Sequence, residues 1–289
     1  MTLSANKKAK ATKRARFTAY IAFSSVLAVF FLFPYAVMLS KSLMEGYESV
    51  AVPPRFFPTV LNFLGFKNAI DPLFLKYLWN TLYVLVFNMF FGTLSALLCA
   101  YSFAKLKWKG RSFVFAVTLA TMMMPGIVLQ IPLYIMYVKV FRWTDTLAPL
   151  TIPSLFGGGA LSIFLIRQFM LSFPKELDDA ARIDGAGTLT HFFKIIVPLC
   201  MPIIVYLVIS AFMGVWNDFM GPLIYISNPD KYTIPVGIYF RFTEMDYSGI
   251  LKANTQMATG VILSVPTAIL FIIFQKKLID GIMIGSIKG

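Results

Sequence analysis

The amino-acid sequence predicts an all-α, polytopic membrane protein with six transmembrane helices and both termini in the cytoplasm. Of its 289 residues, 58% are hydrophobic and only 13% are charged, which is about half the charged share of an ordinary soluble domain. Six stretches contain no Asp, Glu, Lys, Arg or His, and each is long enough to cross the ~30 Å hydrocarbon core of a bilayer as a helix. They are residues 18–40, 77–104, 112–138, 146–166, 195–217 and 253–275.

The basic residues predict the orientation of these spans, because Lys and Arg concentrate in cytoplasmic segments. Of the 26 basic residues, 17 lie before the first stretch, after the second, after the fourth or after the sixth. An even number of spans returns the chain to this same side. We therefore predict a basic cytoplasmic arm, flexible in character, over residues 1–16, a transmembrane domain over 17–275, and a cytoplasmic tail over 276–289.

Composition also limits the kind of activity to expect. The net charge of +13 is explained by topology and contact with anionic lipid rather than by nucleic-acid binding, since the basic arm adjoins a span. Cys99 and Cys200 fall inside spans, and with the single His191 they do not make a metal site. No GxxxxGK[ST] phosphate loop is present, so we expect no cofactor in this chain, and we predict no catalytic residue.

In the first half of the chain, prolines and polar residues are expected to interrupt or mark the helices. Pro34 is expected to break the first span near its outer end. The external segment 41–76 holds several prolines and is predicted to be irregular or partly helical. The second span carries Asn80, Asn88 and Gly92, and small or polar residues of this kind are typical of helix–helix faces in membranes.

The third and fourth spans are predicted to be interrupted. The third contains Met122-Met-Met-Pro125-Gly126 and then Gln130-Ile-Pro132, and the fourth contains Pro149, Pro153 and Gly157-Gly-Gly159. Lipid cannot satisfy the backbone groups that such breaks release, so these helices must be packed in a bundle or line a cavity. Broken helices near the bilayer middle commonly form transport pathways; simple packing kinks are the alternative.

Asp218 is the ionisable residue inside the long apolar run 195–229. An intramembrane charge is a functional candidate by default, although a capping or loop-pinning role fits its position near the outer interface equally well. The candidate pathway residues are Met124, Gln130, Asn217 and Asp218.

The loop between the fourth and fifth spans, residues 172–196, carries the most specific pattern. Pro174 can start a short helix over Lys175–Arg182, with acidic residues in its first turn where the helix dipole favours them. Gly185 can adopt the left-handed turn that ends it, and a second amphipathic stretch then leads to Pro198. A polar segment without catalytic groups suggests that another protein holds it; a loop lying on the membrane surface is the alternative.

The spacing of Asp179-Ala180-Ala181, three residues, Gly185, nine residues, and Ile195-x-x-Pro198 resembles the EAA loop of bacterial ATP-binding-cassette importer permeases. The whole chain is similar to the shorter permease subunit of the maltose-transporter-type carbohydrate permeases. Asp179 stands where that family usually has Glu, and Val197 where Leu is usual before the proline. Both keep the charge or the apolar character.

This resemblance implies the type I ABC importer permease fold, in the bacterial cytoplasmic membrane, and import of an oligosaccharide or other carbohydrate by alternating access. It implies a second homologous permease, two cytoplasmic ATPase subunits that bind ATP and Mg, and an extracytoplasmic solute-binding protein, besides the lipid bilayer and with no nucleic acid. The implied coupling residues are Glu176, Asp179, Ala180, Ala181, Arg182, Asp184, Gly185, Ile195 and Pro198. The implied ATPase contacts of the tail are Lys288 and Gly289.

Two other functions are alternatives to this one. An ion-coupled secondary carrier needs several paired intramembrane charges, and only Asp218 offers one. A membrane-embedded lipid-modifying enzyme needs clustered His, Asp or Glu at an interface, and the single His191 lies in the 172–196 loop.

Overall fold

The computed structural model describes residues 2–243 and 252–286, and the regular structure of these residues is helical. The chain groups into two compact units. Unit 1 comprises Met1–Asp71 with Glu244–Pro266, and unit 2 comprises Pro72–Thr243 with Thr267–Gly289.

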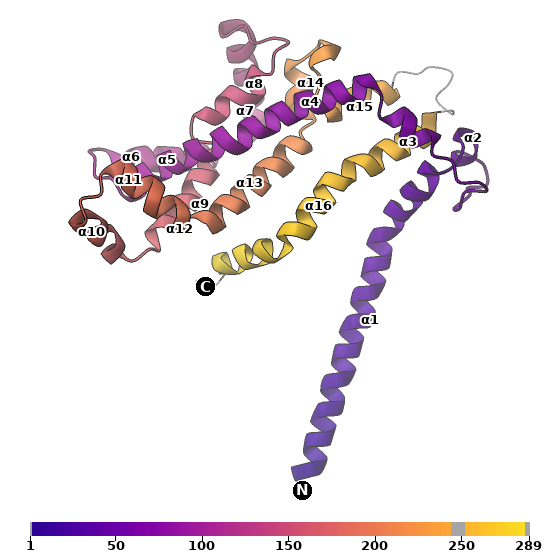
Figure 1. The fold of residues 1–289 in the computed structure, drawn as a ribbon, viewed down its shortest axis with the longest axis horizontal. Helices are drawn as coiled ribbons and strands as arrows, with labels where there is room; N and C mark the ends of the chain where they lie inside the picture. Colours follow the sequence, from indigo (N-terminus) through magenta and orange to yellow (C-terminus); the bar gives the residue numbers. More distant parts are fainter. Residues whose placement is uncertain (1, 244–251, 287–289) are drawn as a thin grey trace. The chain divides into compact units, whose positions relative to one another are not determined.

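Figure 1 shows the order of the helices. The α-helices are α1 (Thr2–Ser42), α2 (Gly46–Ser49), α3 (Leu64–Ala69), α4 (Pro72–Phe87), α5 (Thr93–Ala104), α6 (Arg111–Thr121), α7 (Gly126–Tyr134), α8 (Ala148–Thr151), α9 (Ala160–Leu171), α10 (Lys175–Ile183), α11 (Thr188–Thr190), α12 (Val197–Leu199), α13 (Met201–Trp216), α14 (Met220–Tyr225), α15 (Ile234–Thr243) and α16 (Ala253–Ser286). Three π-helical segments are η1 (Asn88–Gly92), η2 (Ile135–Val140) and η4 (His191–Ile196), and two 3₁₀ segments are η3 (Ile152–Leu155) and η5 (Pro229–Lys231).

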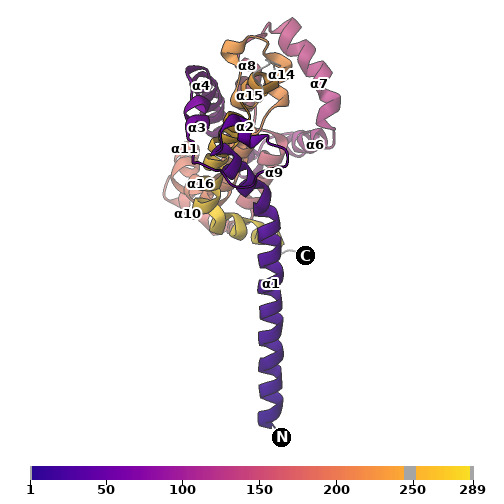
Figure 2. The same ribbon diagram turned by 90° about the vertical axis from the view of Figure 1, so that its right-hand side faces the viewer.

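The helices include several that are long and apolar enough to cross a membrane. Within residues 2–243 and 252–286, four helices meet this requirement singly, and two further pairs of helices meet it together but are bent. The four are Arg16–Ser42, Pro72–Ala104, Ala148–Leu171 and Ala253–Gln275. The bent pairs are Arg111–Thr121 with Gly126–Val140, at 97°, and Thr188–Leu199 with Met201–Trp216, at 76°. The first of these bends is visible where α6 meets α7 in Figure 2.

The break at Pro125 is confirmed, since α6 ends at Thr121 and α7 begins at Gly126. Pro132, in contrast, lies within α7 and does not interrupt it. The expected break at Pro34 was wrong, because α1 continues through this proline as one helix that also contains most of the basic arm. A transmembrane helix can tolerate an internal proline when its neighbouring turns satisfy the released carbonyl.

In unit 1, the start of α16 packs against the end of α1 and against α3. The Asn254 side-chain amide donates a hydrogen bond to the Met44 carbonyl oxygen at 3.0 Å. A Cβ atom on Gly65 would lie 3.0 Å from the Asn254 carbonyl oxygen, and one on Gly260 would lie 2.8 Å from the Met38 sulfur. Small residues therefore let these helices approach closely.

The irregular segment after α1 is organised around the buried carboxylate of Glu48. Its Oε1 atom accepts hydrogen bonds from the Thr59 hydroxyl and from the Thr59 backbone N–H at 2.9 Å, and Arg55 Nη1 lies 3.4 Å away. The Thr59 hydroxyl, its backbone N–H and the Arg55 guanidinium lower the pKa of the Glu48 carboxyl below its usual value. The ionised form is thus the one that holds this segment together.

A lowered pKa gives a stabilisation that is present at neutral pH and is lost as the pH falls through the folded-state value. Hydrogen exchange of peptides covering residues 45–62 should therefore lose protection on acidification from neutral pH towards about pH 3. Thr59→Val removes one donor and should move that loss to higher pH. Equal midpoints in the two proteins would contradict this role for Glu48.

In unit 2, polar side chains of the second span satisfy backbone groups released by the interrupted fourth span. Asn88 Nδ2 donates to the Leu150 carbonyl oxygen at 2.8 Å. Ser95 Oγ donates to the Leu155 carbonyl oxygen at 2.5 Å and accepts from the Gly157 N–H at 2.7 Å. The sequence prediction that Asn88 lies on a helix–helix face is confirmed.

The same contact brings two glycines together. A Cβ atom on Gly158, whose φ is +59°, would lie 2.4 Å from the Gly92 carbonyl oxygen, so only glycine fits. Beyond it, α5 packs along α9 and the buried core of unit 2 begins. This core consists of Ala96, Leu97, Ala100, Tyr101, Phe103, Ile163, Ile166, Met170, Phe192, Ile196, Cys200 and Leu207.

Gly158→Ala should lower the thermal stability of the purified protein, because backbone strain alone costs about 1–2 kcal/mol and the Gly92 carbonyl cannot move aside like a side chain. Gly126→Ala is the matched control, since nothing lies within 4 Å of its Cβ position. If both variants melt at the same temperature as the native protein, glycine is not required at position 158.

Candidate functional site

The loop between α9 and α13 is a capped, exposed helix followed by a tight turn. Pro174 precedes α10, and Glu176 and Asp178 lie in its first turn. After Ile183 the chain closes in a Schellman motif: the Gly185 N–H donates to the Arg182 carbonyl oxygen at 3.1 Å, and the Ala186 N–H to the Ala181 carbonyl oxygen at 2.9 Å. Gly185 has φ +73°, so the predicted left-handed turn is confirmed.

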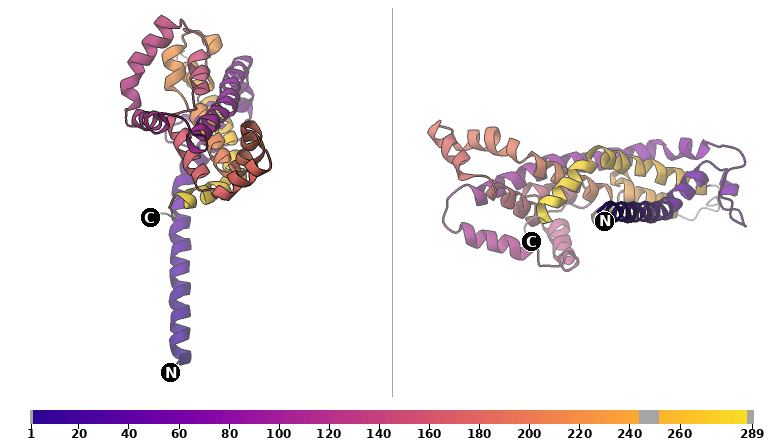
Figure 3. Two further views of the ribbon diagram at one scale, coloured as in Figure 1. Left: turned by 90° about the vertical axis from the view of Figure 1, so that its left-hand side faces the viewer. Right: turned by 90° about the horizontal axis from the view of Figure 1, so that it is seen from below.

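This loop lies at one end of unit 2, beside the end of α5 (Figure 3, right, salmon). The buried residue of α10 is Ala181. Large apolar side chains face outward instead, with Ile183 86% exposed, Leu189 70% and Phe193 53%. An exposed apolar surface bordered by charges is typical of a protein-binding site.

Most of the sequence-predicted coupling residues lie on the outside of this loop. Glu176, Asp179, Ala180, Arg182, Asp184, Gly185 and Pro198 are exposed, Ile195 is half-buried and Ala181 is buried. Arg182 Nη1 is 3.9 Å from Asp179 Oδ1, with both side chains exposed. The predicted tail residues Lys288 and Gly289 lie outside the residues that the structure describes.

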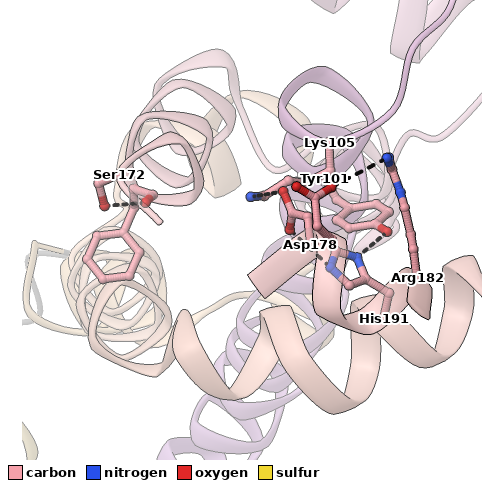
Figure 4. A network of polar contacts seen from close by, with 8 residues as sticks. Tyr101, Lys105, Ser172, Asp178, Arg182 and His191 are labelled. Atoms are coloured by element: carbon pink, nitrogen blue, oxygen red, sulfur yellow. Dashed lines mark hydrogen bonds and ion pairs between the residues drawn. The ribbon is translucent and has the colours of Figure 1, made fainter. Parts of the chain in front are cut away.

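A polar network that sequence reasoning missed attaches this loop to α5 (Figure 4). Lys105 Nζ lies 2.8 Å from Asp178 Oδ2, and His191 Nε2 lies 3.1 Å from Asp178 Oδ1. The Tyr101 hydroxyl lies 2.8 Å from His191 Nδ1. The only signals in the sequence were a lone histidine in an amphipathic stretch and a lysine directly after a span.

A cavity of about 100 Å³ adjoins the network and is lined by its four residues together with Leu106, Ala181, Arg182, Ala186 and Thr188. A second, of about 270 Å³, lies after α5 between Lys107 and Phe113. A third, of about 310 Å³, is lined mainly by small and polar residues: Asn88, Gly92, Thr93, Ser154, Gly158, Ser162, Leu207, Ser210, Ala211, Gly214 and Val215.

The four predicted pathway residues lie between α6 and α7, within α7, and between α13 and α14. Met124 is exposed between α6 and α7, and Gln130 is half-buried in α7. Asn217 donates to the Met213 carbonyl oxygen at 2.8 Å, and Asp218 Oδ1 accepts from the Gly221 N–H at 3.0 Å. The bonds of Asn217 and Asp218 are local caps, and the described lining of the 310 Å³ cavity includes none of the four.

Among residues 2–243 and 252–286, no group of three or more His, Cys, Asp or Glu side chains could hold a metal ion. The loop offers exposed apolar side chains, charged side chains beside them and a tight turn.

Comparison with protein families gives one match over most of the chain. The family model described as "Binding-protein-dependent transport system inner membrane component" matches residues 88–283.

Curated relatives extend over nearly the full length. The arabinooligosaccharides transport system permease protein AraQ of Halalkalibacterium halodurans is 30% identical and the match covers 94% of each chain. The sulfoquinovosyl glycerol transport system permease protein SmoH of Agrobacterium fabrum is 32% identical, with 92% of each chain covered. The trehalose/maltose transport system permease protein MalG of Thermococcus litoralis is 27% identical, covering 91% of this chain and 94% of the relative.

Among solved structures, the fold is similar to that of a chain in a bacterial ABC transporter involved in the import of the acidic polysaccharide alginate. The TM-score is 0.78 at 20% identity, covering 92% of this chain and 97% of that one.

Proposed function

Since this chain belongs to the family of binding-protein-dependent transport system inner membrane components, we propose that it is the permease subunit of an ATP-driven importer for an oligosaccharide or related carbohydrate. The family is one of transporters rather than enzymes. Several relatives carry names that refer to sugar transport: arabinooligosaccharides, sulfoquinovosyl glycerol and trehalose/maltose. These names support a carbohydrate substrate for this chain.

The observation that carries the proposal is the exposed loop of α10 to α12. Ile183 at the end of α10 and Leu189 in α11 are both exposed to solvent on either side of the tight turn. This surface is suited to dock in a cleft of a cytoplasmic ATPase subunit. The docking residues would be those predicted from the sequence, from Glu176 to Pro198. Two ATPase subunits would hold ATP and Mg, and their closure would move this loop as a rigid body. Lys288 and Gly289 would add a second contact.

The proposed topology has six spans, with each bent helix pair counted as one, and both termini in the cytoplasm of a bacterial cell. The excess of basic residues on the side of the loop supports this orientation. A second, homologous permease would complete the transmembrane pathway, and an extracytoplasmic solute-binding protein would deliver the sugar to the other side. The crystal structure of an alginate ABC transporter with its alginate pentasaccharide-bound periplasmic protein, whose fold is also similar at a TM-score of 0.61, supports this arrangement.

The pathway itself is proposed to run past the bent third span, where Met124 and Gln130 lie, past Asn217 and Asp218, and past the 310 Å³ cavity. Hydroxyl and amide groups of that cavity, such as those of Ser162, Ser210 and Asn88, match the hydrogen-bonding needs of a sugar. Rocking of the helices about this cavity would open it to one side of the membrane at a time.

Gly185→Val should abolish co-purification of the ATPase while leaving the protein in the membrane, since a β-branched residue is strained at φ +73°. Gly187→Val is the matched control: its φ is −67° and nothing lies within 4 Å of its Cβ position, so binding should persist. Normal ATPase binding and transport by the Gly185 variant would overturn the docking role of this loop.

Topology can be tested by labelling. In a protein with Cys99 and Cys200 replaced by serine, Thr190→Cys should react with a membrane-impermeant maleimide only after the cells are opened. Modification from outside intact cells would place the loop on the wrong side for an ATPase.

A further inference from the structure

Asp178 joins α10 to two different membrane-spanning segments. One carboxylate oxygen contacts Lys105, which directly follows α5, and the other contacts His191, the first residue of η4. Ala181 is the buried residue of α10, so this helix has little apolar anchorage. Its position relative to the spans therefore depends on the polar contacts of Asp178.

These contacts are largely shielded from water, which strengthens the attraction between the charged groups. The Lys105 side chain is 9% exposed and that of Asp178 is 20% exposed. Removing one partner would leave the other charge partly buried without compensation, which is far more costly than losing a surface pair. The Asp179–Arg182 pair on the same helix is 3.9 Å apart and exposed, and pairs of that kind contribute little.

The network can be satisfied in either protonation state of His191. When the ring is neutral, Nε2–H donates to Asp178 and Nδ1 accepts from the Tyr101 hydroxyl. When the ring is charged, Nδ1–H donates to Tyr101, whose hydroxyl can turn towards the Thr188 carbonyl oxygen, 3.4 Å away. The charged neighbours facing the ring are Asp178, Lys105 and Arg182. The attachment therefore does not require a particular charge on His191.

Beneath the network, packing is tight. The Tyr101 ring meets the Phe192 ring edge-on with 5.1 Å between centroids. Phe192 and Ile196 are fully buried in the core that α5 and α9 share. A force on α10 would thus pass through Asp178 into two helices that are themselves held rigidly.

We propose that Lys105, Asp178, His191 and Tyr101 form a clamp that makes α10 move as one body with the ends of α5 and η4. They are positioning residues for energy coupling: they transmit the motion of the ATPase and do not themselves bind ATP or solute. The inference rests on the proposed function, since it presumes that an ATPase moves α10.

The test uses the assembled complex, purified through a tag on this chain and reconstituted in liposomes. Spin labels on Lys175→Cys in α10 and Lys109→Cys after α5, both exposed, report the distance between the two elements by electron paramagnetic resonance. Measurements are made without nucleotide and after trapping with Mg-ATP and vanadate. Variants are Lys105→Met, Asp178→Asn and the double variant, with Lys105→Arg as the conservative change and Lys107→Met, at an exposed lysine two residues further on, as the matched control.

The clamp predicts one unchanged distance in both nucleotide states for the native protein, Lys105→Arg and Lys107→Met. In Lys105→Met and in Asp178→Asn the distance should shift on trapping. The double variant should shift no further than Asp178→Asn alone, because the Lys105–Asp178 contact is already lost in that variant. If a substitution only disturbed the local structure, it would change the distance by the same amount without nucleotide and after trapping. If Asp178→Asn does not accumulate, Lys105→Met and Tyr101→Phe decide the question.

Two results would overturn the clamp. One is a native distance that itself changes on trapping, and the other is a Lys105→Met protein that behaves like Lys107→Met. Failure of any ATPase to co-purify with the native chain is a separate outcome, which would overturn the proposed function and the clamp with it.

Discussion

A chain that crosses a bilayer must satisfy its backbone hydrogen bonds without water, and this constraint explains where the helices of unit 2 can break. The fourth span is interrupted at Gly157–Gly159, and the released groups find partners on the second span. Ser95 bridges the Leu155 carbonyl and the Gly157 N–H, and Asn88 reaches the Leu150 carbonyl. Because Gly158 lies against the Gly92 carbonyl, the two spans are close enough for these short side chains to reach. The 310 Å³ cavity lies at the same crossing.

Outside the hydrocarbon core of the bilayer, water is present and this constraint no longer applies. The loop of α10 to α12 leaves large apolar residues exposed. In the proposed function a partner protein covers them. The loop still has to be attached to the spans, and Asp178 provides that attachment through Lys105 and His191. In the proposed function the two faces of α10 have separate roles: the exposed face would meet the ATPase, and the shielded face would transmit its motion.

The sequence predicted the features that depend on local chemistry. Apolar run length located helices and bent helix pairs that are long enough to span a membrane, Pro125 marked the bend between α6 and α7, and Gly185 marked the left-handed turn after α10. Pro34 was misread because proline is a weaker helix breaker in a membrane than in water. The pairs Lys105–Asp178 and Tyr101–His191 join residues 73 and 90 positions apart, and no periodicity or spacing rule signals such contacts. The sequence indicated a possible capping role for Asp218 but not for Asn217. A polar residue in an apolar run can serve either as a cap or as part of a ligand site, and the sequence does not distinguish the two.

In the proposed function, ATP hydrolysis by a partner drives transport through this chain. The most direct measurement is uptake of radiolabelled arabino- and malto-oligosaccharides by the reconstituted complex, with the binding protein added outside and nucleotide enclosed. The account predicts uptake that requires enclosed ATP and continues in the presence of an ionophore. Uptake that proceeds without ATP and collapses with the ionophore would contradict it and favour an ion-coupled carrier.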